Sequence, residues 1–197
     1  MKLAALALAL GLISPVAFAA PTLSVDFEKV WDFGTEVANT YAVQGVSFTN
    51  VLGLSNGDGL GGLPNGDYYA GAPSPLGVAF VQLDGITNTA AYMNVVDGLS
   101  DGLSFFYASV DTITILAYSG LNGAGDLLGS ITLDATGDFS TWSHAVLNFN
   151  GTAQSFDLSG ANGVAALDNI ASIPEPSSVA LLLAAGGAVA LTRRRRG

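Results

Sequence analysis

The chain has 197 residues, a formal net charge of −10 and no cysteine. The absence of cysteine excludes disulfide bonds and thiolate metal sites, so a folded domain must depend on its apolar core. The excess of sixteen acidic over six basic residues disfavours nucleic acid and anionic lipid as partners, because both require positive charge on the protein.

The first residues predict a secretory signal peptide. Lys2 supplies a positive charge, an apolar run follows over residues 3–13, and Ala-Phe-Ala at 17–19 fits the small-x-small rule for cleavage. We expect cleavage at the end of that triplet, which assigns residues 1–19 to the signal peptide. A retained N-terminal anchor is the alternative.

An all-β domain is predicted between the two ends of the chain. Asn-Gly and Asp-Gly turn signals recur, and short runs rich in β-branched, aromatic and apolar residues lie between them. We expect a single antiparallel β-sandwich, jelly-roll-like, over residues 20–172. Its strands are predicted over residues 23–28, 45–51, 77–83, 91–96, 103–108, 110–118, 127–133, 142–149, 153–158 and 164–171.

The clearest predicted strand is 110–118. Ile113 and Ile115 alternate with Thr112 and Thr114, so the isoleucines are predicted to face the core. Its register is expected to be firm, because a slip of one residue would turn both isoleucines to solvent.

Two stretches are predicted as loops. Residues 27–41 show only an interrupted helical spacing, so at most one helical turn is expected there. Residues 52–76 contain seven glycines and three prolines, too many for a regular strand or helix.

Tyr68 and Tyr69 lie in the second loop and are predicted to be exposed, which makes them the preferred residues for stacking on sugar rings. The aromatic side chains considered for such stacking are Trp31, Tyr41, Tyr68, Tyr69, Tyr92, Tyr107, Tyr118 and Trp142.

Charge is distributed unevenly along the chain. Fifteen of the sixteen acidic residues but only one of the six basic residues, Lys29, fall within the predicted domain. Such a domain suits divalent cations or neutral sugars as ligands. The alternative is an acidic surface that only keeps an exported protein soluble.

The sequence contains no clear catalytic motif. His144 is the only histidine, and a Ser-His-Asp triad would also need a nucleophile, for which no G-x-S-x-G elbow is present. Fifteen acids make some carboxylate pair unavoidable, so a glycosidase pair is not specifically indicated. We therefore predict that the protein is not an enzyme.

A proline-bounded tripeptide, an apolar run and a basic block follow one another after the predicted domain. Pro174 and Pro176 flank Glu175 and favour an extended, accessible backbone. Every residue over 179–191 is apolar or glycine, which predicts a short membrane helix. By the positive-inside rule the basic block stays cytoplasmic and leaves the domain on the far side of the membrane. The block consists of Arg193, Arg194, Arg195 and Arg196.

This order of features over residues 173–197 resembles the PEP-CTERM sorting signal of Gram-negative bacteria, with Ile173 where valine is common. In that family the membrane protease exosortase recognises the tripeptide and removes the tail, and the proteins are associated with exopolysaccharide and biofilm production. The resemblance implies export through the inner membrane, transient anchoring by the tail helix, and delivery to the cell surface or the extracellular matrix. A plain C-terminal anchor is the alternative.

Both ends of the domain resemble exported β-sandwich domains similar to carbohydrate-binding modules. The resemblance implies that the first and last strands lie together and that their acids hold a structural calcium ion, with Asp26, Glu28 and Asp168 as the ligands. In a strand, Asp26 and Glu28 would share one face. The alternative is that these acids cap turns or are solvated. The resemblance rests on the sequences at 26–28, 34–35, 41, 45–48 and 166–170.

Together these features predict an exported surface protein that acts at the exopolysaccharide matrix as a glycan-binding module with structural calcium. The expected partners are exosortase, an extracellular polysaccharide, and the membrane through the tail helix. Two alternatives stay open, a structural matrix protein without a specific ligand and a glycoside-acting enzyme. Exposed aromatic residues on one face would favour the binding module, and a deep acidic cleft would favour the enzyme.

Overall fold

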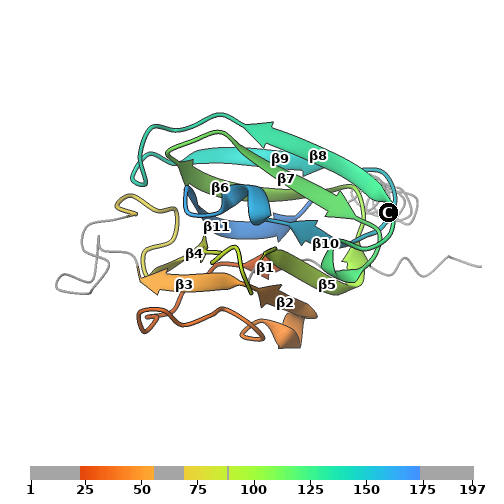
Figure 1. Cartoon of the computed structure of the whole chain (residues 1–197), viewed down its shortest axis with the longest axis horizontal. Helices are drawn as coiled ribbons and strands as arrows, with labels where there is room; N and C mark the ends of the chain where they lie inside the picture. Colours follow the sequence, from red (N-terminus) through yellow and green to blue (C-terminus); the bar gives the residue numbers. More distant parts are fainter. Residues whose placement is uncertain (1–22, 56–68, 88, 174–197) are drawn as a thin grey trace, which may run out of the picture. The chain divides into compact units, whose positions relative to one another are not determined.

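Two antiparallel β-sheets make up the part of the chain that the computed structural model describes (Figure 1). The described residues are 23–55, 69–87 and 89–173. The predicted signal peptide, most of the predicted glycine-rich loop and the tail beyond Ile173 lie outside them. Within the described part, no helix is long and apolar enough to cross a membrane.

One sheet has six strands and includes the first and the last strand of the described chain. Its strands are β1 (Ser24–Val25), β3 (Val51–Ser55), β4 (Gly77–Val81), β6 (Gly102–Ser109), β9 (Ser143–Asn148) and β11 (Ala165–Ser172). The order is β3-β4-β11-β6-β9, and β1 also pairs with β11. β11 therefore has β6 along one edge, and β4 and β1 in succession along the other.

The other sheet has five strands in the order β2-β5-β10-β7-β8. Its strands are β2 (Val46–Thr49), β5 (Tyr92–Leu99), β7 (Ile113–Tyr118), β8 (Leu127–Leu133) and β10 (Ala153–Asp157). Three short 3-10 helices lie in the connections of the described chain, η1 (Ala42–Gln44), η2 (Leu121–Gly123) and η3 (Ser159–Ala161). The fold is thus the antiparallel β-sandwich that the turn and strand pattern predicts.

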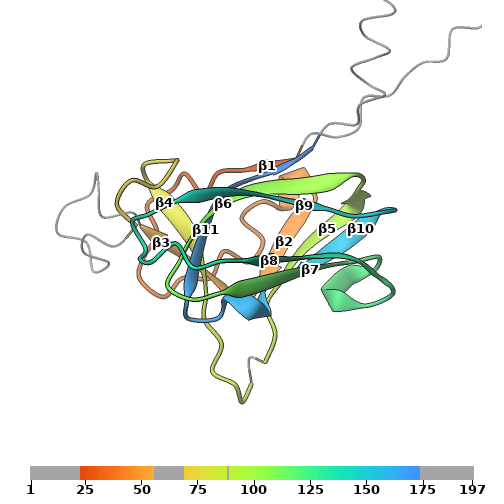
Figure 2. The ribbon, with the colours of Figure 1, turned by 90° about the horizontal axis from the view of Figure 1, so that it is seen from above.

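The core lies between the two sheets. Figure 2 shows β6 in one layer and β7 and β8 in the other. Phe27, Phe105 and Phe156 are among the largest fully buried side chains, and burying each one stabilises the fold by about 1.5–3 kcal/mol. The predicted alternation in β7 is confirmed, because Ile113 and Ile115 are buried in this core.

Each predicted strand has a counterpart in the structure, but the strand predicted over 45–51 was wrong in its extent. Asn50 has a φ of 56° and separates β2 from β3, which belong to different sheets. Asparagine tolerates this left-handed conformation better than most residues, and the Asn50 Nδ2 donates to the carbonyl of Ala90 at 2.7 Å. The loop predicted over residues 52–76 was therefore wrong for residues 52–55, which belong to β3.

The first predicted strand, over 23–28, was also too long. Only Ser24 and Val25 pair as β1, and Phe27 has a φ of 54°. This kink buries the Phe27 ring against Tyr41 and Phe48, with ring centroids 5.7 Å away from each. Core burial of an aromatic ring thus ends the strand, and the period-two argument for residues beyond Val25 does not apply.

Candidate functional site

The outer surface of the five-stranded sheet carries an ordered row of polar and aromatic side chains. Met93, Phe156 and Ala117 pair across β5, β10 and β7 and are buried in the core. Side chains alternate between the two faces of a strand. The residues on either side of Met93, Phe156 and Ala117 in the sequence therefore point away from the core, to the outer surface of the sheet. The strand pairing then defines one outer row, which is Thr49, Tyr92, Asp157, Leu116 and Ser130.

A second outer row runs beside the first and contains Asn94, Ser155 and Tyr118. The η2 segment folds over this row. The Asn94 Nδ2 donates to the Asn122 Oδ1 at 2.8 Å, and the Asn122 N–H donates back to the Asn94 Oδ1 at 2.8 Å. The Gly123 N–H donates to the Ser155 Oγ at 2.9 Å. These bonds fix η2 against the sheet, and we call the outer surface formed by both rows the tyrosine face.

The Tyr92 ring lies against Gly123 and near a carboxylate. A Cβ on Gly123 would be 2.8 Å from the Tyr92 Cε1, so only glycine allows this contact. Burial raises the pKa of the Tyr92 hydroxyl, and the Asp157 carboxylate and the Tyr118 hydroxyl raise it further. The Tyr92 hydroxyl therefore stays protonated at physiological pH and can both donate and accept a hydrogen bond.

The tyrosine face combines the two features that a sugar requires. Tyr92 and Tyr118 lie in neighbouring rows on the strands either side of β10, and these two strands are about 10 Å apart. Both are half-buried, so each ring keeps an accessible surface. Asp157 lies between these strands, and its Oδ1 accepts from the Ser159 N–H at 2.8 Å. Aromatic surfaces with fixed hydrogen-bonding groups between them are typical of small-ligand sites.

The predicted ligand-binding residues are not on this face. Tyr68 lies outside the described residues. Tyr69 is only 5% exposed, and its ring centroid lies 6.2 Å from that of Phe80 and 5.7 Å from that of Phe139. The prediction that Tyr69 is exposed was wrong, because its ring is covered by other aromatic rings over the outer surface of the six-stranded sheet.

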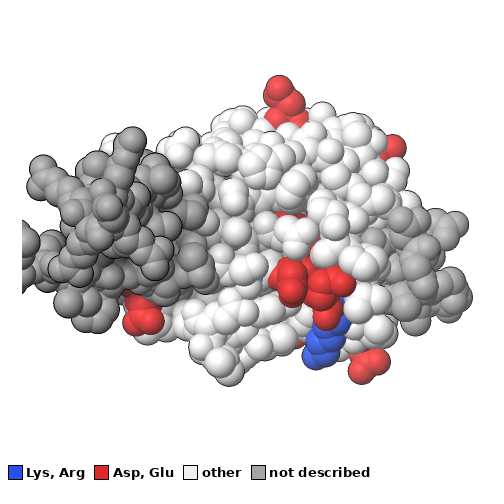
Figure 3. Space-filling model, turned by 180° about the vertical axis from the view of Figure 1, so that it is seen from behind, with Lys and Arg blue, Asp and Glu red and all other residues white. Residues whose placement is uncertain are grey.

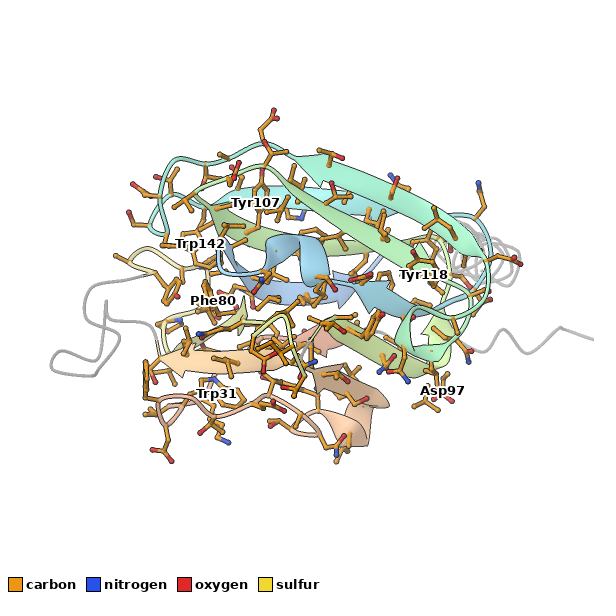
Figure 4. All side chains as sticks on the ribbon, viewed as in Figure 1. Trp31, Phe80, Asp97, Tyr107, Tyr118 and Trp142 are labelled. Carbon is orange, nitrogen blue, oxygen red and sulfur yellow. The ribbon has the colours of Figure 1, made fainter. Side chains whose placement is uncertain are left out.

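These rings belong to a second apolar cluster, which we call the aromatic cluster. It is built on Leu54, Val78 and Ala166, whose strand neighbours Ala79 and Leu167 face the core between the sheets. Trp142 and Phe80 lie toward one end of the molecule and Tyr118 toward the other (Figure 4). The cluster and the tyrosine face are therefore separate surfaces on different sheets. The members of the aromatic cluster are Leu52, Leu54, Tyr69, Ala72, Val78, Phe80, Phe139, Trp142 and Ala166.

Asp168, a predicted calcium ligand, is a fully buried carboxylate in β11. It accepts from the Ser74 Oγ at 2.8 Å, from the Ser74 N–H at 2.9 Å and from the Asn169 N–H at 2.7 Å. Burial raises the pKa of Asp168 to about 6, with a smaller contribution from Glu28, while these hydrogen bonds oppose the rise. Desolvation thus outweighs the donors that stabilise the charged form.

Asp26 and Glu28, the other predicted ligands, lie in the same neighbourhood. The Glu28 Oε1 accepts from the Leu76 N–H at 2.9 Å, and the Asp26 Oδ1 accepts from the Glu28 N–H at 3.2 Å. Burial raises the pKa of Tyr41 well above its usual value, and Asp26, Asp168 and Glu28 raise it further. All three carboxylates are therefore within electrostatic reach of one hydroxyl.

These acids do not form a complete metal site by themselves. No group of three carboxylate, imidazole or thiol side chains among the described residues is arranged to hold a metal ion. Figure 3 shows a group of acidic side chains beside a single basic one, and Lys29 is the only lysine or arginine in the described ranges. The Lys29 Nζ lies 4.6 Å from the centre of the Trp31 ring. Calcium would need backbone carbonyls or water as further ligands.

His144 lies on β9, as predicted, with its side chain exposed. Its ring centroid is 5.0 Å from that of Phe106. The strand pairing places the two residues opposite each other on neighbouring strands, where a ring pair stabilises a sheet. The arrangement of His144 is accounted for by this packing.

Comparison with known proteins identifies the tail. Residues 172–196 match the model of the PEP-CTERM protein-sorting motif, so the predicted resemblance of the tail is confirmed. The chain is an all-β sandwich protein that carries a PEP-CTERM sorting motif, and such a motif marks a protein for export and sorting to the cell surface. No curated protein is significantly similar in sequence to the chain.

Solved structures of similar shape include carbohydrate-binding modules. The chain is similar to CsCBM6-3 from Clostridium stercorarium in complex with cellobiose, with 15% identity, 78% of this chain and 94% of that chain covered, and a TM-score of 0.43. It is similar to a β-1,3-glucan binding CBM6 from Bacillus halodurans, with 14% identity, 79% and 97% covered, and a TM-score of 0.45. An adhesin domain of Lys-gingipain from Porphyromonas gingivalis W83 gives 13% identity, 79% and 99% covered, and a TM-score of 0.47. These scores are low, so the fold assignment rests on the strand pairing of this chain.

Proposed function

We propose that the protein is an exosortase-sorted surface protein that binds a neutral polysaccharide through its tyrosine face. The observation that carries the proposal is the placement of Tyr92, Asp157 and Tyr118 together on the solvent side of the five-stranded sheet. The sorting motif supports delivery to the cell surface. Extracellular polysaccharide of the surrounding matrix is then the ligand within reach.

Binding would use the rings and the carboxylate in different ways. The Tyr92 and Tyr118 rings offer flat surfaces for the C–H faces of sugar rings. The Asp157 carboxylate accepts hydrogen bonds from sugar hydroxyls, and a charged acceptor makes such bonds stronger. The hydrogen bonds from η2 to Asn94 and Ser155 hold this segment against the sheet, so little ordering would be needed on binding.

Charge supports a neutral rather than an anionic ligand. Lys29 is the only lysine or arginine of the described part, and it lies over Trp31 rather than on the tyrosine face. Trp31 packs against Gly53 in β3 of the six-stranded sheet. A polymer rich in uronic acids would therefore meet Asp157 without a compensating cation, which is unfavourable.

The experiment measures binding of the processed protein to immobilised polysaccharides. Tyr92→Ala and Tyr118→Ala should each weaken binding to a neutral glucan about tenfold, since aromatic residues dominate many binding energies. Phe33→Ala is the matched control, because Phe33 is 73% exposed but lies outside the tyrosine face. Unchanged binding by both tyrosine variants would contradict the proposal. Failure to bind any glycan would favour a structural matrix protein.

A structural calcium ion near Asp26, Glu28 and Asp168 is a second, separate proposal. Its support is that Asp168 is a buried carboxylate whose pKa is raised, with Glu28 nearby. Within the described residues no lysine or arginine neutralises Asp168. Calcium binding only to the native state would raise the melting temperature relative to EDTA. The same shift in the wild type and in Asp168→Asn would place any bound ion elsewhere.

A further inference from the structure

The sandwich and the sorting motif share a residue. β11 ends at Ser172, and the matched sorting motif begins at Ser172. Ile173 is the last described residue, and Pro174 follows it directly in the sequence. No spacer therefore separates the folded sheet from the Pro-Glu-Pro tripeptide.

The last two described residues are held by the fold. The Ser172 N–H donates to the carbonyl of Leu23 at 3.1 Å, and the Leu23 N–H donates to the Ser172 Oγ at 2.9 Å. The Ile173 N–H donates to the carbonyl of Gly102 at 3.2 Å. A Cβ on Gly102 would be 2.7 Å from the Ile173 Cδ1, so the side chain of Ile173 also packs closely on β6.

The strand that leads to the motif is an internal one. Ser172 and Ala171 pair with Leu103 and Ser104 of β6 on one side, while Ala171 also pairs with Ser24 of β1 on the other. The backbone of these residues is thus engaged along both edges. A protease that binds its substrate as an extended strand needs the same backbone groups.

We infer that release of Ser172 and Ile173, the first two residues of the sorting motif, from the sheet is a step in processing by the sorting protease. The inference rests on the proposed sorting by exosortase. Cutting of a protected segment follows the population of its locally opened form. Hydrolysis then consumes one water molecule and leaves a carboxylate on the domain and an amine on the tail.

The geometry explains which part of the sheet would open. β1 has only two residues, and Ser172 and Ile173 lie at the end of β11 away from Ala166 and Leu167, which pair with β4. The bonds of these two residues to Leu23 on one side and to Leu103 and Gly102 on the other can therefore be released without disturbing the pairing of β4. Short terminal segments open at the lowest free energy in a folded protein. The sandwich can therefore stay folded while its last residues enter the protease.

The first test uses the full chain in cells that process it. A flexible Gly/Ser spacer of about eight residues, spanning roughly 15 Å, is inserted between Ile173 and Pro174. Removal of the tail should become about tenfold faster, because opening of the sheet is no longer needed. The same spacer inserted between Gly85 and Ile86, in an exposed turn, is the control and should leave the rate unchanged. Equal rates of tail removal for the wild type, the chain with the spacer after Ile173 and the control chain would overturn the inference.

A second test separates this inference from the sorting proposal. Residues 174–176 are replaced by the recognition sequence of a purified site-specific protease, with and without the spacer. We expect slow cutting without the spacer and fast cutting with it. Fast cutting of both chains would overturn the inference whatever happens in cells. A wild-type tail that is never removed in cells would contradict exosortase sorting, while the purified protease would still report whether the sheet protects the site.

Discussion

The tyrosine face and the aromatic cluster both place aromatic side chains on an outer surface, but they use them differently. In the aromatic cluster, the Phe80 and Phe139 ring centroids lie 5.9 Å apart and both rings pack on Tyr69. On the tyrosine face, Tyr92 and Tyr118 have Asp157 between their strands. Rings that cover one another stabilise the fold, whereas rings separated by polar side chains keep surface for a ligand. The number of aromatic residues alone does not identify a binding surface.

The largest expected effect is on stability, in the aromatic cluster. Phe80→Ala should lower the free energy of unfolding by about 3 kcal/mol, the lower end of the range found when packed phenylalanines are truncated to alanine. Urea denaturation measures this change, and Phe33→Ala should stay within about 0.5 kcal/mol of the wild type. Polysaccharide binding by the folded Phe80 variant should be unchanged. Loss of binding without loss of stability would make the aromatic cluster, rather than the tyrosine face, the ligand surface.

The two sheets also differ in how their carboxylates are placed. Asp168 of the six-stranded sheet is fully buried, whereas Asp157 of the five-stranded sheet is only partly buried. The pKa of Asp168 in the folded chain, about 6, is above its ordinary value of 3.8. The contribution of Asp168 to the free energy of unfolding is therefore fully present below about pH 4 and is lost as the pH rises through 6. In EDTA, the wild type should lose about 2 kcal/mol more than Asp168→Asn between pH 4 and pH 7.5. If the free energies of unfolding of the two proteins changed with pH in the same way, the pKa of Asp168 would not be raised by folding.

Asp157 should instead affect binding. Asp157→Asn keeps an oxygen that can accept from the Ser159 N–H but removes the charge. We expect polysaccharide affinity to fall by about 1.5 kcal/mol, roughly tenfold in Kd, since hydrogen bonds to charged groups are worth more than neutral ones. Calorimetric titration measures the affinity, and the melting temperature should hardly change. An affinity equal to the wild type would remove the carboxylate from the proposed site.

The smallest expected effect tests how Tyr92 is positioned. Gly123→Ala should destabilise the chain by about 1 kcal/mol, because its φ of 72° is unfavourable for alanine. It should also weaken polysaccharide binding, because the new Cβ would displace the Tyr92 ring. Gly163→Ala is the matched control, with a φ of 69° and no atom near the new Cβ. Equal binding by the two variants would mean that the position of Tyr92 does not matter.

Much of the strand pattern could be predicted because it is local. Alternation in β7 buries Ile113 and Ile115 in the core, as expected from a period of two. Two of the errors of extent occur at Asn50 and Phe27, and both residues have a positive φ. A left-handed residue bends the chain at one position, which the hydrophobic pattern around it does not reveal.

The candidate site could be predicted only in part. Tyr92 and Tyr118 stood among eight aromatic residues that could stack on sugars, but the sequence favoured Tyr68 and Tyr69 because they lie in the glycine-rich loop. Strand order and register place them beside Asp157, and these depend on pairing between segments far apart in the chain. No signal in the sequence marked Asp157 among the fifteen acids of the domain.

The sequence by itself determined the all-β class, most strand positions and the sorting motif, because each depends on residues that are neighbours in the chain. Only the tertiary structure decided which aromatic rings are covered, which acids are buried, and that the sorting motif begins where β11 ends. These properties depend on which strands lie side by side and which faces they bury. Burial and register are set by contacts across the two sheets, so they exist only once the sandwich has formed.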